Sequence, residues 1–269
     1  MPAGFFIGVP GTMLSLPDAQ GALSMSDGPD VNLTTLLGGG RFASVAAGSR
    51  RAWKVDIPAM SPTEISNLSI LLRAMPAPYA WLSVWATRVN VLTPDMSLFK
   101  TTYAGLTKGA IVECEGGIFT PSASSATGAL AFLGAGIPVF PGMPVTGSFF
   151  ARQSGASPVS VYVRFKDAAG VTFNSNAGSL AVIGTGPMQR ITRSTIAPAG
   201  AVTAELLVQN ASLVAAPALT YTATANEWGV GDGCLSSVVS GFEVTPTEIE
   251  TDSPGDRLAD VSFTVMEVG

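Results

Sequence analysis

The sequence predicts a mainly β protein, built around an antiparallel sandwich and carrying one α-helix. From Val159 to Phe165 apolar and polar residues alternate, which is the pattern of a strand with one buried and one solvated face. The following Asp167–Gly170 is typical of a hairpin turn. The 30 glycines and 19 prolines interrupt the chain at short intervals, which favours many short strands. A capped helical pattern is evident only at about 62–75.

The composition limits the classes of partner. Charged residues make up 12% of the chain and apolar residues 47%, so we expect an uncharged surface that packs against copies of the same chain. The net charge is -5 and no basic cluster exceeds Arg50-Arg51, which argues against a nucleic-acid partner. No run of 18 apolar residues and no signal-peptide pattern is present, so we expect no membrane partner and synthesis in a cytoplasm.

The residue types also argue against catalysis. Histidine is absent, which removes the commonest general base and every Ser/His or Cys/His pairing. No phosphate-binding loop, dinucleotide fingerprint or nucleophile elbow occurs. We therefore expect no enzyme activity, no catalytic residue and no cofactor. Calcium would need several oxygen ligands close together. The candidate carboxylates form no contiguous loop motif, so we expect no metal either; they are Glu113, Glu115, Asp167 and Asp232.

The first part of the chain predicts a small sheet and a helix. Residues 1–40 indicate one strand and a long segment that is either a mobile terminus or an arm on a neighbouring subunit. A strand pair at 41–47 and 51–57 follows. Ser61 and Glu64 form a capping box at the start of the helix Pro62–Met75. The strand Tyr79–Leu92 is apolar on both faces, which predicts a central or inter-subunit strand rather than a ligand platform.

The second part predicts a jelly-roll sandwich inserted into that first domain. The short strands are expected near 110–115, 129–132, 146–153, 159–166, 180–183, 189–196, 202–208, 219–228 and 237–244. A last alternating strand, 261–265, is separated from them by polar sequence and needs a partner. We expect it to return to the first sheet, so that 1–109 and 246–269 form one domain and 110–245 the insertion. Cys114 and Cys234 are either free thiols or a bridge between the first and last strands of the insertion.

Several motifs resemble the distal tail proteins, minor tail proteins of long-tailed bacteriophages. A Gly-rich lead-in precedes an Arg-Arg-x-Trp strand formed by Arg50, Arg51 and Trp53. A capped helix at Ser61–Met75, an aromatic strand that ends at Val89–Pro94 and a closing strand at Val261–Gly269 complete the set. The middle of the chain resembles jelly-roll carbohydrate-binding modules. The segments that carry this second resemblance are Val139–Gly142, Tyr162–Gly170, Gln189–Thr192 and Ala197–Ala201.

The first resemblance implies a tail-tube-like β domain in a structural virion protein. Members of that family form a ring, usually six-fold, that joins the tail tube to the tail tip. The expected partners are copies of this chain in a hexameric ring, the tail tube, the tail-tip hub of the baseplate and a host cell-wall glycan. The expected location is the phage tail of the virion. The alternative is a soluble carbohydrate-binding protein with no role in assembly.

A sugar site in such a module would use exposed aromatic rings flanked by hydrogen-bonding side chains. Tyr162 and Arg164 lie on the polar side of their strand, and Trp228 lies in loop-like sequence. The candidate carbohydrate-binding residues are Tyr162, Arg164, Arg190, Tyr221 and Trp228, with Arg152 as a further candidate. The alternative is that Trp228 caps the core and Tyr162 is an ordinary surface tyrosine.

Overall fold

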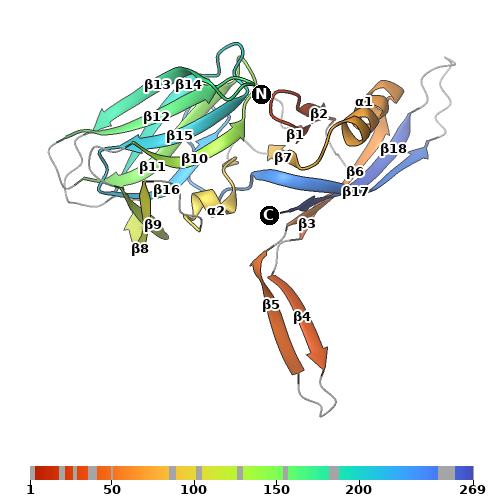
Figure 1. Cartoon of the computed structure of the whole chain (residues 1–269), viewed down its shortest axis with the longest axis horizontal. Coiled ribbons are helices and arrows are strands. Elements are labelled where there is room, and N and C mark those ends of the chain that lie inside the picture. Colours follow the sequence, from red (N-terminus) through yellow and green to blue (C-terminus); the bar gives the residue numbers. More distant parts are fainter. Residues whose placement is uncertain are drawn as a thin grey trace. The chain divides into compact units, whose positions relative to one another are not determined.

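A computed structural model describes residues 4–17, 22–26, 29–35, 41–49, 51–84, 89–100, 105–125, 130–153, 157–181, 188–247 and 258–268 (Figure 1). The chain divides into two compact units. The sandwich unit comprises Met1–Met13 and Leu82–Leu235, and the split unit comprises Leu14–Trp81 and Ser236–Gly269. The sequence-based division differs from this one at three segments. It placed 1–13 and 82–109 in the first domain, and it placed 236–245 in the inserted sandwich.

The sandwich unit consists of two antiparallel sheets. The front sheet has the strand order β10-β15-β12-β13, and the back sheet has the order β14-β11-β16-β9-β8. Their strands are β8 (Leu106–Cys114), β9 (Ile118–Ser125), β10 (Leu130–Pro138), β11 (Pro144–Arg152), β12 (Val159–Lys166), β13 (Thr172–Ala181), β14 (Gln189–Ile196), β15 (Thr203–Gln209) and β16 (Leu213–Thr220). The prediction of a mainly β protein with an antiparallel jelly-roll sandwich is confirmed.

The core lies between the two sheets and is filled by alternate residues of their strands. On β12, Val159, Val161, Val163 and Phe165 are fully buried, as their spacing predicts. Burying each such side chain contributes about 1.5–3 kcal/mol. The sheets approach closely at Gly147, where a Cβ would stand 2.5 Å from the Leu206 side chain. A larger residue there would push the sheets apart.

Several predicted boundaries in this unit are wrong. The short helix α2 (Pro94–Ser97) and the strand β9 were not predicted. The strand expected at 219–228 ends at Thr220, and the residues after it form a loop. In the sequence 219–228, apolar and polar residues alternate over too few positions to distinguish a strand from a packed loop.

The split unit contains a sheet in which strands from before and after the sandwich pair with each other. Within the unit its order is β7-β17-β18-β6-β3. C-terminal β18 pairs antiparallel with β6, with Phe263 opposite Val55, so the predicted return of the last strand is confirmed. Its elements are β2 (Leu14–Leu16), β3 (Ala22–Ser26), β6 (Ala52–Met60), α1 (Pro62–Ala74), β7 (Tyr79–Val84), β17 (Cys234–Pro246) and β18 (Ala259–Glu267).

One face of this sheet is buried and the other is polar. Trp53, Val55 and Ile57 of β6 are buried, as are Val261 and Phe263 of β18. Helix α1 begins as predicted: Ser61 Oγ accepts from the Glu64 amide, and the Glu64 carboxylate accepts from the Ser61 amide at 2.8 Å. The helix buries Leu68 and Leu71.

The N-terminal region has more strands than expected. β1 (Gly4–Gly8), β2, β3 and β4 (Pro29–Thr35) all fall within the first 40 residues, where one strand was predicted, so that prediction is wrong. β4 pairs with β5 (Arg41–Ser49) in a two-stranded sheet, and no other described strand joins it. The predicted strand Tyr79–Leu92 is β7 up to Val84, and residues 85–88 lie outside the described residues.

Candidate functional site

The front sheet brings Tyr162 and Arg164 together on its outer face. Both lie on β12, two residues apart, pointing away from the core. The Tyr162 hydroxyl donates to Gln209 Oε1 of β15 at 2.9 Å. The Arg164 guanidinium lies over the ring of Phe132 of β10, 5.1 Å from its centroid. Three adjacent strands therefore contribute to one surface that combines aromatic rings with polar groups.

A buried carboxylate fixes the two cations of this face. Glu205 of β15 lies opposite Arg164, and its side chain is only 4% exposed. Arg164 Nη2 lies 2.6 Å from Glu205 Oε2, and Lys166 Nζ lies 2.7 Å from Glu205 Oε1. One carboxylate thus partners two cations, which holds both in defined positions. We call the group Phe132, Tyr162, Arg164, Lys166, Glu205 and Gln209 the front face.

Arg190 lies on the opposite side of the sandwich. It is on β14 of the back sheet, directly across from Phe150 of β11. Its guanidinium carbon is 5.8 Å from the Phe150 ring centroid, and Nη2 donates to Ser148 Oγ at 3.0 Å. Burial lowers the pKa of the Arg190 guanidinium because desolvation disfavours its charged form.

Trp228 lies on the same side as Arg190. Its half-buried ring packs against a small cluster outside the main core that includes Phe150 and Cys114. Its Nε1 donates to the Pro217 carbonyl at 3.1 Å. The indole is thus held against the back sheet with part of its surface exposed. We call the group Ser148, Phe150, Arg152, Arg190 and Trp228 the back face.

Tyr221 is not a surface residue, and its assignment to a sugar site is corrected here. It is 3% exposed, its hydroxyl donates to the Pro138 carbonyl, and its ring packs edge-on against Phe140. Desolvation raises the pKa of its phenol. A ring enclosed in this way has no face on which a sugar can stack.

The five sequence-predicted residues therefore do not form one site. Tyr162 and Arg164 share the front face, Arg190 and Trp228 share the back face, and Tyr221 is in the core. Sequence reasoning missed Phe132, Glu205 and Gln209. The alternation of 202–208 predicts that Glu205 faces away from the core, but the register that places it opposite Arg164 is a tertiary property.

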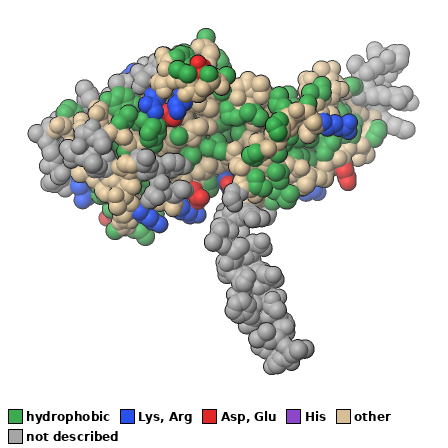
Figure 2. Space-filling model, viewed as in Figure 1, with side chains coloured by type: hydrophobic (Ala, Val, Ile, Leu, Met, Phe, Trp, Pro, Cys, Tyr) green, Lys and Arg blue, Asp and Glu red, His purple; other side chains and the backbone are tan. Residues whose placement is uncertain are grey.

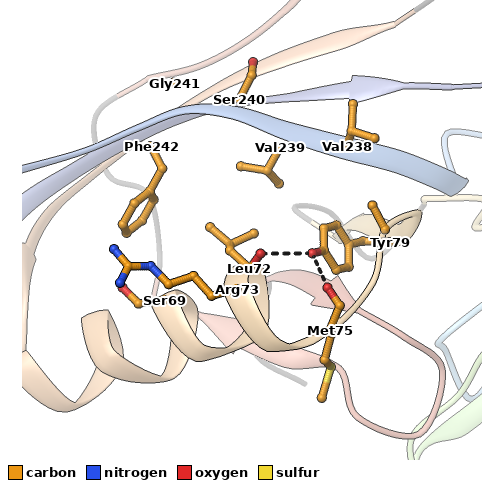
Figure 3. Close-up of a pocket in the computed structure, with 11 residues that line it drawn as sticks. Ser69, Leu72, Arg73, Met75, Tyr79, Val238, Val239, Ser240, Gly241 and Phe242 are labelled. Carbon is orange, nitrogen blue, oxygen red and sulfur yellow. Dashed lines mark hydrogen bonds between the residues drawn. The ribbon is translucent and has the colours of Figure 1, made fainter.

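A separate pocket of about 510 Å³ lies within the split unit, between α1 and β17 (Figure 3). Val239 and Phe242 of β17 point toward Leu72 and Arg73 of α1, whereas Ser240 points away. A β-bulge explains this, because the register shifts between Ser240 and Glu243. The lining has one charged group, a guanidinium, and no carboxylate or thiol, so it offers apolar packing surface rather than a reactive group.

Other candidate chemistry is limited. Cys114 and Cys234 are both buried and free, so the free-thiol interpretation holds and the bridge is not formed. Among the described residues no group of three or more His, Cys, Asp or Glu side chains is arranged to hold a metal. No helix in the described part of the chain is both long and apolar enough to cross a membrane. Charged side chains are sparse on the face shown in Figure 2.

Comparison with known proteins gives structural similarities only. No family model matches the chain, and no curated protein matches it. It is similar to the enzymatically active domain of tailspike protein 4 of bacteriophage CBA120, with 16% identity, a TM-score of 0.40, and coverage of 51% of this chain and 22% of that one. It is also similar to the Clostridium thermocellum xylanase 10B CBM22-1-GH10 modules complexed with xylohexaose, with 16% identity, a TM-score of 0.35, and coverage of 49% and 28%.

A third similar structure is a CBM4 module, with 13% identity, a TM-score of 0.28, and coverage of 49% of this chain and 86% of that one. The chain thus spans about a fifth of the tailspike chain and just over a quarter of the xylanase chain. With TM-scores this low, these similarities carry no information about function.

Proposed function

We propose that this chain is a structural virion protein of a long-tailed bacteriophage, a distal-tail-type ring subunit whose sandwich contacts a host surface glycan. The observation that carries the proposal is the pairing of β18 with β6. The split unit is made from two chain segments with the sandwich inserted between them. This is the organisation that the sequence resemblance to distal tail proteins implies.

The two-stranded sheet β4–β5 supports the self-assembly part of the proposal. It makes no pairing with another described strand. A lone two-stranded sheet is marginally stable in water at best, and its unpaired strand edges are templates for further pairing. A neighbouring copy in a ring supplies the missing contacts. The low charged fraction, 12%, suits a surface that packs against such copies.

The front face supports the glycan part of the proposal. Tyr162 and Phe132 supply rings for stacking, and Gln209 and Arg164 supply hydrogen bonds. Glu205 fixes Arg164 and Lys166, so little side-chain entropy is lost on binding. No catalytic step is part of this proposal.

The assembly proposal is tested on the full chain by light scattering coupled to size exclusion, and by electron microscopy of the purified protein and of phage particles. The expected result is a closed ring of copies and the presence of the chain at the distal end of the tail. A monodisperse monomer at high concentration, together with absence from particles, would overturn it.

The alternative is a soluble carbohydrate-binding protein that does not assemble. Titration with neutral host cell-wall polysaccharide addresses the binding part independently of assembly. Tyr162→Ala removes a ring from the front face and is expected to weaken binding, because sugar stacking on the ring and hydrogen bonding through its hydroxyl are both lost at that position. Ile196→Ala, which removes an exposed apolar side chain of the back sheet, is the matched control. Binding by a protein that remains monomeric favours the alternative.

A further inference from the structure

Two arginines on the outer face of the back sheet have no carboxylate partner among the described residues. Arg152 lies on β11, two residues beyond Phe150, and Phe150 lies opposite Arg190 on β14. Phe149 and Ala151 occupy the core, so Phe150 and Arg152 point outward. Arg152 and Arg190 are thus diagonal cross-strand neighbours, a spacing of about 7–8 Å that is typical of antiparallel strands and within reach of long side chains.

Neither guanidinium is satisfied by the described part of the protein. The Nε atoms of Arg152 and Arg190 are both buried without a hydrogen-bond partner. Arg190 has one bond, to the neutral Ser148 hydroxyl, and neither arginine forms an ion pair with a described carboxylate. The pKa of Arg190 is lowered by desolvation, with no carboxylate to offset it.

The front face of the same sandwich provides a comparison, because its two cations have a carboxylate partner. There Arg164 and Lys166 also lie on one outer sheet surface, but Glu205 accepts from both at 2.6–2.7 Å. On the back face, by contrast, the buried Nε atoms of Arg152 and Arg190 have no partner among the described residues, and a buried polar group without a partner is costly. The back face therefore offers two guanidinium groups that an anion can bind.

We propose that the back face binds an anionic saccharide, one that bears phosphate or carboxylate groups. Arg152 and Arg190 supply two guanidinium groups, each able to form paired hydrogen bonds with an oxyanion. The exposed part of the Trp228 ring, packed on the Phe150 cluster, supplies an apolar surface for the sugar. This inference rests on the proposed glycan contact and names the ligand class of a second site.

The aromatic component favours a saccharide over an acidic peptide. An acidic peptide needs only the two charges, whereas a sugar ring also uses the Trp228 surface. The bond from Trp228 Nε1 to the Pro217 carbonyl at 3.1 Å fixes the ring in the free protein. Binding through this face must therefore depend on the indole as well as on the arginines.

The test titrates the full chain with four probes: polygalacturonate, poly(glycerol phosphate), a neutral glucan and poly-glutamate. Isothermal titration at low and at physiological salt should show binding of one or both anionic carbohydrate polymers, weakening as salt screens the charges. The polymer that binds distinguishes carboxylate from phosphate. Arg152→Gln with Arg190→Gln should weaken that binding tenfold or more, since each charged hydrogen bond contributes about 1.5–3 kcal/mol.

Two controls separate the site from general electrostatics and from the front face. Lys100→Gln with Lys108→Gln makes the same charge change on exposed residues of this unit and should have little effect. Trp228→Phe keeps an aromatic ring at the same position and should weaken binding less than Trp228→Ala. Binding of the neutral glucan should depend on Tyr162 and not on the two arginines. Failure of the front-face glycan proposal can therefore be distinguished from failure of the back-face proposal.

Folding of each variant is checked by its unfolding temperature. If the double arginine variant does not fold, Arg190→Lys keeps the charge but removes the planar fork, and ¹⁵N signals of the wild-type arginine Nε groups report direct contact with the polymer. The proposal is overturned by absence of anionic polymer binding at low salt, by equal loss in the lysine control, or by poly-glutamate binding as tightly as the saccharides without dependence on Trp228.

Discussion

Arg51 and Glu267 are 216 residues apart in sequence and form a bidentate ion pair within the split unit. Arg51 Nε lies 2.9 Å from Glu267 Oε2, and Nη2 lies 2.8 Å from Oε1. The Glu267 amide also donates to the Arg51 carbonyl at 2.9 Å. Arg51 is 3% exposed and its guanidinium lies over Trp53. The pair thus joins the two chain segments that flank the sandwich.

Replacing Glu267 should destabilise the split unit strongly. Glu267→Gln removes the bidentate carboxylate partner of the buried Arg51 guanidinium, and breaking a buried ion pair typically costs about 3–5 kcal/mol. Urea unfolding followed by tryptophan fluorescence measures this, because Trp53 and Trp81 are both buried in the same unit. Lys54→Ser is the control, since Lys54 is 64% exposed and its contact with Asp56 is 3.6 Å long. A loss in the control as large as in Glu267→Gln would contradict the assigned role.

Gly241 should be specifically required for the bulge in β17. Its φ of 63° is in the left-handed region, which costs a residue with a Cβ about 1–2 kcal/mol. A Cβ there would meet no atom within 4 Å, so Gly241→Ala should lose stability through backbone strain alone. Gly241→Asn should lose less, because Asn tolerates this conformation. Equal losses in thermal unfolding would rule out strain as the cause.

The start of α1 should depend on its capping box. Ser61 Oγ accepts from the Glu64 amide at 3.3 Å, and Ser61→Ala removes this bond. The expected cost is about 1 kcal/mol of unfolding free energy. Thr63→Ala, at an exposed position of the first turn, should change stability little. Ser61→Asp should restore most of the loss, and failure to do so would argue against capping.

Stability should fall at alkaline pH because of two buried acids. Burial raises the pKa of Cys114 and of Tyr221 above their ordinary values of 9.0 and 10.0. Above those values the unfolded chain loses these protons while the folded protein retains them, so the unfolding free energy decreases as pH rises. Below about pH 8 neither group contributes to the pH dependence.

The measurement is urea unfolding between pH 8 and pH 11. Tyr221→Phe should reduce the decline above pH 10, although losing the bond to the Pro138 carbonyl lowers stability at every pH. Tyr162→Phe is the matched control on the half-buried front face. An unchanged decline in Tyr221→Phe would show that other groups cause it.

Much of the local structure could be predicted, but the candidate site could not. The alternation at 159–165 predicted which side of β12 is buried, and Ser61 and Glu64 predicted where α1 begins. For Tyr221, however, an aromatic residue after an apolar run looked the same as a surface residue in sequence. Only the packing against Phe140 and the bond to Pro138 reveal that it is in the core.

The sequence by itself determined the class of fold, the position of α1 and the need of the last strand for a partner, because periodicity and capping act over a few residues. The tertiary structure decided everything that depends on register between distant strands. It placed Glu205 opposite Arg164, Arg190 opposite Phe150 rather than opposite a carboxylate, and β18 next to β6. Side-chain alternation specifies a face, whereas the partner across that face is set by the pairing of the whole sheet.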